Sequence, residues 1–166
     1  MTVRTNTTRL MAAGAIGNLL EWYDFAVYGY FAAAIGRAFF PEQDKVAQIL
    51  AAFGVFAVGF MMRPIGGALF GHVGDRIGRS PALPLSVTAM AVPTFLIGVL
   101  PGYDVLGLAA PVLLTLLRMM QGLSVGGEYA TSIVFLVEHT PPERRGVVGA
   151  VADLGAVSGI LLGSAT

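Results

Sequence analysis

The chain contains no cysteine among its 166 residues and only two histidines. The absence of thiols excludes disulfide bridges, a thiol nucleophile and any cysteine-ligated metal site. His72 and His139 lie too far apart in the sequence to suggest a cluster of metal ligands. We therefore expect neither a metal site nor a resident cofactor.

Charge is also scarce. Charged residues make up 12% of the chain, whereas a soluble domain usually carries about a quarter. Ten basic and ten acidic residues leave a formal net charge of zero, which gives no electrostatic basis for binding nucleic acid. Hydrophobic residues make up 55%, and the mean hydropathy is +0.75. This composition indicates a protein whose partner is the lipid bilayer.

Long apolar stretches recur along the whole chain, and strand-like alternation is nowhere sustained. A bilayer about 30 Å thick requires roughly 20 predominantly apolar residues in a helix. Five stretches meet this requirement, and they cover about residues 10–34, 46–70, 82–100, 112–137 and 146–166. We predict an all-α, polytopic membrane protein whose residues 1–166 form one amino-terminal transmembrane bundle.

Basic residues set the expected orientation, because they are retained on the cytoplasmic side of a membrane. The short loops between the stretches make successive helices antiparallel. Six arginines then fall on the side of the amino terminus, against Arg37 and Lys45 on the other: Arg4, Arg9, Arg76, Arg79, Arg144 and Arg145. We expect a multi-pass protein of the cell inner membrane with a cytoplasmic amino terminus.

Small residues spaced four apart predict close contact between helix backbones. This spacing occurs in three places: Gly67 and Gly71; Gly122 and Gly126; and Gly155, Gly159 and Gly163. Pro64 is expected to kink the second stretch, because it cannot donate a hydrogen bond to residue 60.

Five ionisable residues lie inside the apolar stretches: Glu21, Asp24, Arg118, Glu128 and Asp153. An ionised side chain at mid-bilayer costs about 2.5 to 3.5 kcal/mol, so these groups are expected to face one another or water. Burial favours the neutral form of a carboxyl group, and a nearby arginine favours its ionised form. The four acidic residues are therefore candidates for a proton relay. The alternatives are a static ion pair for Glu21 with Arg118, and an interfacial position for Asp153.

Aromatic and polar residues near these charges are candidates for binding substrate. Arg118 would suit a carboxylate, and Trp22, Tyr23 and Tyr129 could stack against a quaternary amine. Gln121 belongs to the same segment as Arg118 and is a further candidate. The alternative for the aromatic residues is simple packing. No nucleophile and base stand at a spacing that would suggest catalysis, so we predict that the chain is not an enzyme.

A short charged segment separates the second stretch from the third. Residues 71–79 read Gly-His-Val-Gly-Asp-Arg-Ile-Gly-Arg, and we predict a tight cytoplasmic turn that locks and releases the inner ends of two helices. The residues expected to form this gating loop are Gly71, Gly74, Asp75, Arg76, Gly78 and Arg79.

The segment at 71–79 resembles the motif between the second and third helices of the major facilitator superfamily. Three segments resemble its metabolite:proton symporters more closely: Gly-Asn-Leu-Leu-Glu-Trp-Tyr-Asp-Phe at 17–25, Arg-Pro-Ile-Gly-Gly-Ala-Leu-Phe-Gly-His at 63–72, and Arg-Met-Met-Gln-Gly-Leu-Ser-Val-Gly-Gly-Glu-Tyr at 118–129. That branch includes carriers of osmolytes and organic acids. The resemblance implies alternating access between two bundles, with a small polar metabolite and a proton moving together.

Family members have twelve helices, and this chain has about five. We therefore expect it to be a truncated chain that needs the missing carboxy-terminal helices as partners for transport. The alternative function is a membrane remnant or scaffold that transports nothing.

Overall fold

The computed structural model describes residues 7–41, 44–138 and 145–166, and all regular structure within these ranges is helical. The helices are α1 (Thr7–Tyr30), α2 (Ala32–Phe39), α3 (Lys45–Met61), α4 (Arg63–Ile77), α5 (Arg79–Val99), α6 (Tyr103–Leu106), α7 (Ala109–Glu138) and α8 (Arg145–Ser164). They fall into two compact units, one formed by Tyr28–Glu128 and the other by Met1–Val27 with Tyr129–Thr166. We call these the central unit and the terminal unit.

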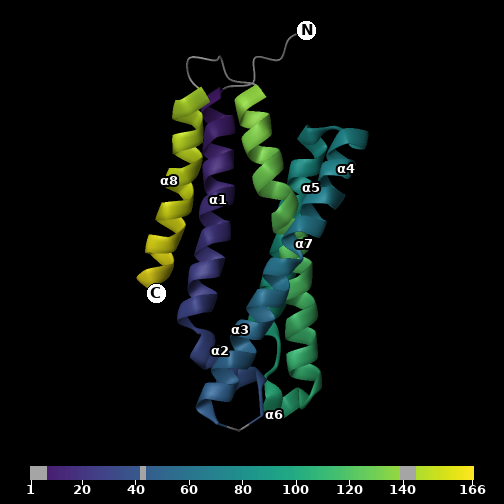
Figure 1. Ribbon diagram of the computed structural model, residues 1–166, viewed down its shortest axis with the longest axis vertical. Coiled ribbons are helices and arrows are strands. Elements are labelled where there is room, and N and C mark those ends of the chain that lie inside the picture. The colour runs from purple at the N-terminus through teal and green to yellow at the C-terminus, as the bar shows by residue number, and fades with distance from the viewer. Residues whose placement is uncertain (1–6, 42–43, 139–144) are drawn as a thin grey trace. The chain divides into compact units, whose positions relative to one another are not determined.

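The central unit contains α2 to α6 and most of α7. Helix α4 continues from the end of α3, α5 lies beside α4, and α7 runs alongside α3 and α4 (Figure 1). The short helices α2 and α6 lie at the end where α3 begins (Figure 1). A small hydrophobic core sits at that end, formed by Phe39, Val55, Ala110 and Leu114. The Asp44 side chain accepts a hydrogen bond from the Val46 backbone N–H at 3.0 Å, which caps the start of α3.

Glycines allow α3 and α4 to approach α7 at backbone distance. A Cβ atom on Gly122 would collide with the carbonyl oxygen of Gly59, and one on Gly126 would collide with that of Arg63. Gly66 faces the backbone of Leu123 in the same manner. The prediction of close packing at Gly122 and Gly126 is therefore confirmed.

The terminal unit pairs α8 with the first part of α1 (Figure 1). A Cβ atom on Gly159 would meet the backbone of Leu19 and Tyr23, and one on Gly163 would meet the Ala26 side chain at 2.6 Å. The glycine spacing of this stretch thus also predicted a real helix contact, because a side chain at either position would push the two helices apart.

The surface of the described helices is apolar, and several polar side chains are buried. Phe95, Leu50 and Met61 expose about two thirds of their surface, whereas Arg118 and Gln121 are buried. Three described stretches are long and apolar enough to cross a membrane: Lys45–Ile77, Ala109–Gly126 and Arg145–Ser164. This inverted distribution is typical of helices that are solvated by lipid. The protein is a multi-pass, helical membrane protein.

Two helix breaks modify the predicted spans. The first span, expected over 10–34, is interrupted at Phe31, where α1 gives way to α2. The second is interrupted at Met62, whose backbone N–H donates to the Gly59 carbonyl at 3.2 Å. Pro64 follows at the second position of α4, so the expected kink is confirmed and takes the form of a break two residues before the proline. That the membrane is crossed by these five stretches, with the bounds given above, stays a prediction.

The predicted turn at 71–79 is wrong in its extent. Residues 71–77 continue α4, and only Gly78 separates α4 from α5. Gly71 and Gly74 do not break the helix, because the segment contains no proline and its backbone hydrogen bonds continue. Gly78 has φ 93 and ψ 151, a conformation that is essentially restricted to glycine. The change of direction is therefore made by one residue.

Candidate functional site

The central unit buries a set of polar side chains on the middle of α7. Arg118, Gln121 and Ser124 are only 7%, 4% and 3% exposed. Successive members are three residues apart, so their side chains lie along nearly the same side of α7. We call these three residues the polar stripe. Because burying polar groups in an apolar helical unit is costly, they must be satisfied by specific partners.

Tyr28 supports the first member of the polar stripe. The guanidinium carbon of Arg118 lies 3.9 Å from the centroid of the Tyr28 ring, a cation–π geometry. The Tyr28 hydroxyl donates to the Ala52 carbonyl at 2.9 Å, and its ring stacks on Phe56 with centroids 5.5 Å apart. The hydrogen bond of its hydroxyl and the contact with Phe56 both restrict the Tyr28 ring. The ring in turn restricts the position of the Arg118 guanidinium group.

The chemistry available at Arg118 follows from this stacking. A guanidinium group carries its N–H donors in a rigid, planar fork. Such a group can donate two parallel hydrogen bonds to a carboxylate. A carboxylate is therefore the group that this buried side chain is chemically matched to bind.

Gln121 joins α7 to α5. Its Nε2 donates to the Thr94 hydroxyl oxygen at 2.6 Å, and the Thr94 hydroxyl donates in turn to the Met90 carbonyl at 2.9 Å. The Oε1 atom of Gln121 is buried and accepts no hydrogen bond from the residues that the structure describes. A buried acceptor without a donor costs about 1 to 3 kcal/mol, which marks this atom as one that a ligand or solvent donor would stabilise.

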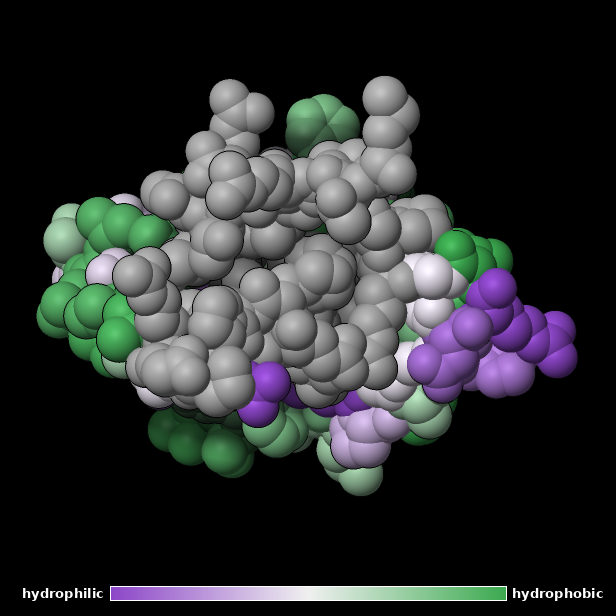
Figure 2. Space-filling model, turned by 90° about the horizontal axis from the view of Figure 1, so that it is seen from above, coloured by the Kyte–Doolittle hydropathy of each residue, from purple (hydrophilic) through white to green (hydrophobic). Residues whose placement is uncertain are grey.

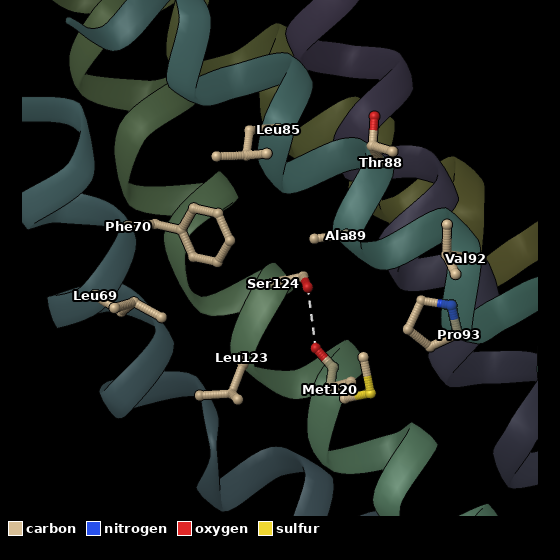
Figure 3. A pocket seen from close by; sticks show the side chains of 10 residues that line it. All are labelled: Leu69, Phe70, Leu85, Thr88, Ala89, Val92, Pro93, Met120, Leu123 and Ser124. Atoms are coloured by element: carbon tan, nitrogen blue, oxygen red, sulfur yellow. Dashed lines mark hydrogen bonds between the residues drawn. The ribbon is translucent and has the colours of Figure 1, made fainter. Parts of the chain in front are cut away.

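An apolar groove of about 400 Å³ opens beside the polar stripe, between α4, α5 and α7. Phe70 and Leu69 line it from α4, and the sticks of Figure 3 show Leu85, Ala89, Val92 and Pro93 from α5 opposite Met120, Leu123 and Ser124 from α7. Ser124 turns its hydroxyl back to the Met120 carbonyl, at 2.9 Å. The groove therefore offers hydrophobic contact and few polar groups.

The terminal unit holds a second group of candidates on α1. Glu21 is only 3% exposed, and Trp22, Tyr23 and Asp24 are half-buried. The Trp22 ring makes an edge contact with Phe25, with centroids 6.2 Å apart. Glu21 and Asp24 are three residues apart on α1, a spacing that places them on one side of the helix.

The residues of the predicted gate lie at the end of α4. Asp75 and Arg76 are exposed, Gly74 is buried, and Arg79 begins α5. Figure 2 shows hydrophilic surface at the edge of the molecule where α4 and α5 meet. The charged groups are therefore available to a further segment or to solvent.

Three other candidates contribute less. Glu128 and Tyr129 belong to α7, but their side chains lie outside the part of the chain that the structure describes in detail. Asp153 is exposed on α8. Among the described residues, no three histidine or acidic side chains come together in a way that could hold a metal ion.

Sequence reasoning missed Tyr28 and Thr94. Tyr28 follows Asp24 by four residues and Glu21 by seven, so helical spacing placed it on the same face, and that pattern could have identified it. Thr94 could not have been found in this way, because its partner Gln121 belongs to another helix and is 27 residues away in the sequence.

Comparison with known proteins gives a consistent result. Residues 10–166 match the family described as "Sugar (and other) transporter". The chain is 43% identical over 156 residues to a proline/betaine transporter of Escherichia coli K12. It is 44% identical over 156 residues to a glycine betaine/proline/ectoine/pipecolic acid transporter of Dickeya dadantii, and 44% identical over 153 residues to a putative proline/betaine transporter of Staphylococcus haemolyticus.

These alignments cover nearly all of this chain but a minor part of each relative. They include 92 to 94% of this chain and 31 to 33% of the relatives, so the chain spans about a third of their length. No solved structure matches it.

Proposed function

The chain belongs to the family of sugar and other transporters within the major facilitator superfamily, and from this premise we propose that it serves proton-coupled symport of a small polar metabolite. The substrate class is a zwitterionic osmolyte or an organic acid, moved by alternating access. The observation that carries the proposal is the 43 to 44% identity to proline/betaine transporters along almost the whole chain.

The buried chemistry of the central unit supports a substrate with a carboxylate. Proline and betaine, the compounds that name the relatives, both carry one. In our proposal the carboxylate is bound by Arg118, whose guanidinium carbon lies 3.9 Å from the centroid of the Tyr28 ring. Gln121 is a further candidate for binding substrate in the central unit, and Trp22, Tyr23 and Tyr129 are the candidates in the terminal unit.

We assign the proton to the acidic residues of the apolar stretches. Glu21 is the most deeply buried of the acidic side chains that the structure describes, at 3% exposure, and an acidic residue inside an apolar stretch is a candidate for carrying a proton. Asp24, Glu128 and Asp153 are further members of the proposed relay. The gate is formed by Asp75 and Arg76 at the end of α4, together with Gly71, Gly74, Gly78 and Arg79.

The location follows from the distribution of arginines. We propose a position in the cell inner membrane with the amino terminus and the α4–α5 junction in the cytoplasm. In our proposal the complete transport activity requires two bundles, and this chain supplies part of the amino-terminal one.

The proposal is tested by uptake into membrane vesicles that contain the protein expressed from its complete gene. Labelled proline, glycine betaine and a set of organic acids are offered with and without a proton gradient. We expect uptake of at least one carboxylate-bearing compound, and its collapse when an ionophore dissipates the gradient. Uptake that is indifferent to the gradient would contradict proton coupling, and uptake of none of these compounds would contradict the substrate class.

A further inference from the structure

The orientation of the Gln121 side chain is fixed by its hydrogen bonds. The Thr94 hydroxyl has one hydrogen, which it donates to the Met90 carbonyl at 2.9 Å. Toward Gln121 it can therefore only accept, so the amide nitrogen must face it, at 2.6 Å. The amide oxygen is therefore not the atom that faces Thr94, and it accepts no hydrogen bond from any described residue.

This oxygen stands beside the proposed carboxylate site. Arg118 precedes Gln121 by three residues on α7, and side chains at this spacing have Cβ atoms about 5 to 6 Å apart. Both side chains are buried. A small zwitterion whose carboxylate contacts Arg118 therefore has its ammonium group within reach of Gln121.

The aromatic surface next to Arg118 is not available to the same ammonium group. The guanidinium covers one face of the Tyr28 ring, and Phe56 stacks on this ring as well. A trimethylated ammonium group depends on open aromatic faces for its binding, because it has no N–H to donate. The groups on this part of α7 are better matched to an N–H donor than to a quaternary amine.

We infer that the Oε1 atom of Gln121 accepts a hydrogen bond from the N–H of a bound amino or imino acid, and that it discriminates such substrates from fully methylated ones. The inference rests on the proposed function and specifies its substrate. Oε1 has no solvent contact in this arrangement, so the bond forms when the helices open to admit substrate, as alternating access requires.

The test uses three compounds that share one carboxylate and differ in the number of N–H groups: sarcosine, N,N-dimethylglycine and glycine betaine. Each competes with labelled glycine betaine for uptake into vesicles that contain the protein from its complete gene. The quantity compared is the half-inhibitory concentration of sarcosine divided by that of unlabelled glycine betaine.

Gln121→Met removes the acceptor and keeps the length of the side chain. We expect it to raise this ratio about tenfold, the effect of one lost hydrogen bond to a charged donor, with a smaller change for N,N-dimethylglycine. Thr94→Val keeps the Oε1 acceptor of Gln121 but removes the hydrogen bond that orients its amide group. We expect this variant to raise the same ratio of half-inhibitory concentrations about threefold. Thr94→Val also provides the test if Gln121→Met fails to insert.

Ser124→Ala is the matched control, because Ser124 is equally buried one turn further along α7 and bonds only to its own helix. Its ratio should equal that of the wild type. Ratios within twofold of the wild type in both the Gln121 and Thr94 variants would overturn the assignment while glycine betaine uptake stands. Absence of wild-type uptake of glycine betaine, proline and every organic acid offered would instead refute the proposed function.

Discussion

At the scale of single residues, spacing in the sequence identified the face of a helix but not its neighbour. Gly122 and Gly126 were predicted to lie at an interface, and both face backbone carbonyls. Gly71 was predicted on the same grounds, yet nothing lies within 4 Å of the place where its Cβ would be. Periodicity is a property of one helix, whereas a contact also depends on where the second helix passes.

The glycine contacts predict that adding a methyl group at an interface position lowers the stability of the protein. We expect Gly66→Ala to lower the thermal unfolding midpoint of the detergent-solubilised protein, because its Cβ would collide with the Leu123 carbonyl. Overpacking of this kind costs about 1 to 3 kcal/mol. Circular dichroism at 222 nm measures the change.

Gly54→Ala is the matched control for this substitution. Gly54 is exposed on α3 with nothing within 4 Å of its Cβ position, and alanine favours helix over glycine. Its midpoint should not fall. A similar fall of the unfolding midpoint in both variants would show that the effect at Gly66 does not come from its close contact with the Leu123 backbone.

At the scale of elements, apolar length located the helices and breakers located only some of their ends. The stretch at 46–70 contained Pro64, and the break at Met62 followed from it. The break at Phe31 had no proline to announce it. The segment at 71–77 was expected to turn because it is rich in glycine and charge, but neither feature removes a backbone hydrogen bond, so α4 continues.

The junction of α4 and α5 therefore depends on one residue. We expect Gly78→Ala to destabilise the protein by about 1 to 3 kcal/mol, because φ 93 with ψ 151 is strained for any residue with a Cβ. The midpoint of thermal unfolding measures this cost. Gly71→Ala, in the helix with open space around it, should show no such loss. Equal unfolding midpoints of the two variants would contradict the conclusion that Gly78 alone makes the turn between α4 and α5.

At the scale of the whole molecule, composition predicted the surroundings of the protein better than it predicted its site. Scarce charge and a mean hydropathy of +0.75 indicated helices in lipid, and the described helices do present apolar surface outward. The candidate site was harder to predict, because it is formed by pairs such as Arg118 with Tyr28, which are 90 residues apart in the sequence and meet only through the fold.

The orientation in the membrane can be tested directly, because the chain has no cysteine of its own. Lys45 and Arg76 are both exposed and lie near opposite ends of the stretch Lys45–Ile77. Its 33 residues span about 50 Å as helix, more than the hydrocarbon core of a bilayer. We expect a membrane-impermeant maleimide to label Lys45→Cys in intact cells and Arg76→Cys only in inverted vesicles. Labelling of both positions from the same side would refute a crossing between them, and the reverse pattern would place the proposed gate outside the cell, where it could not control release into the cytoplasm.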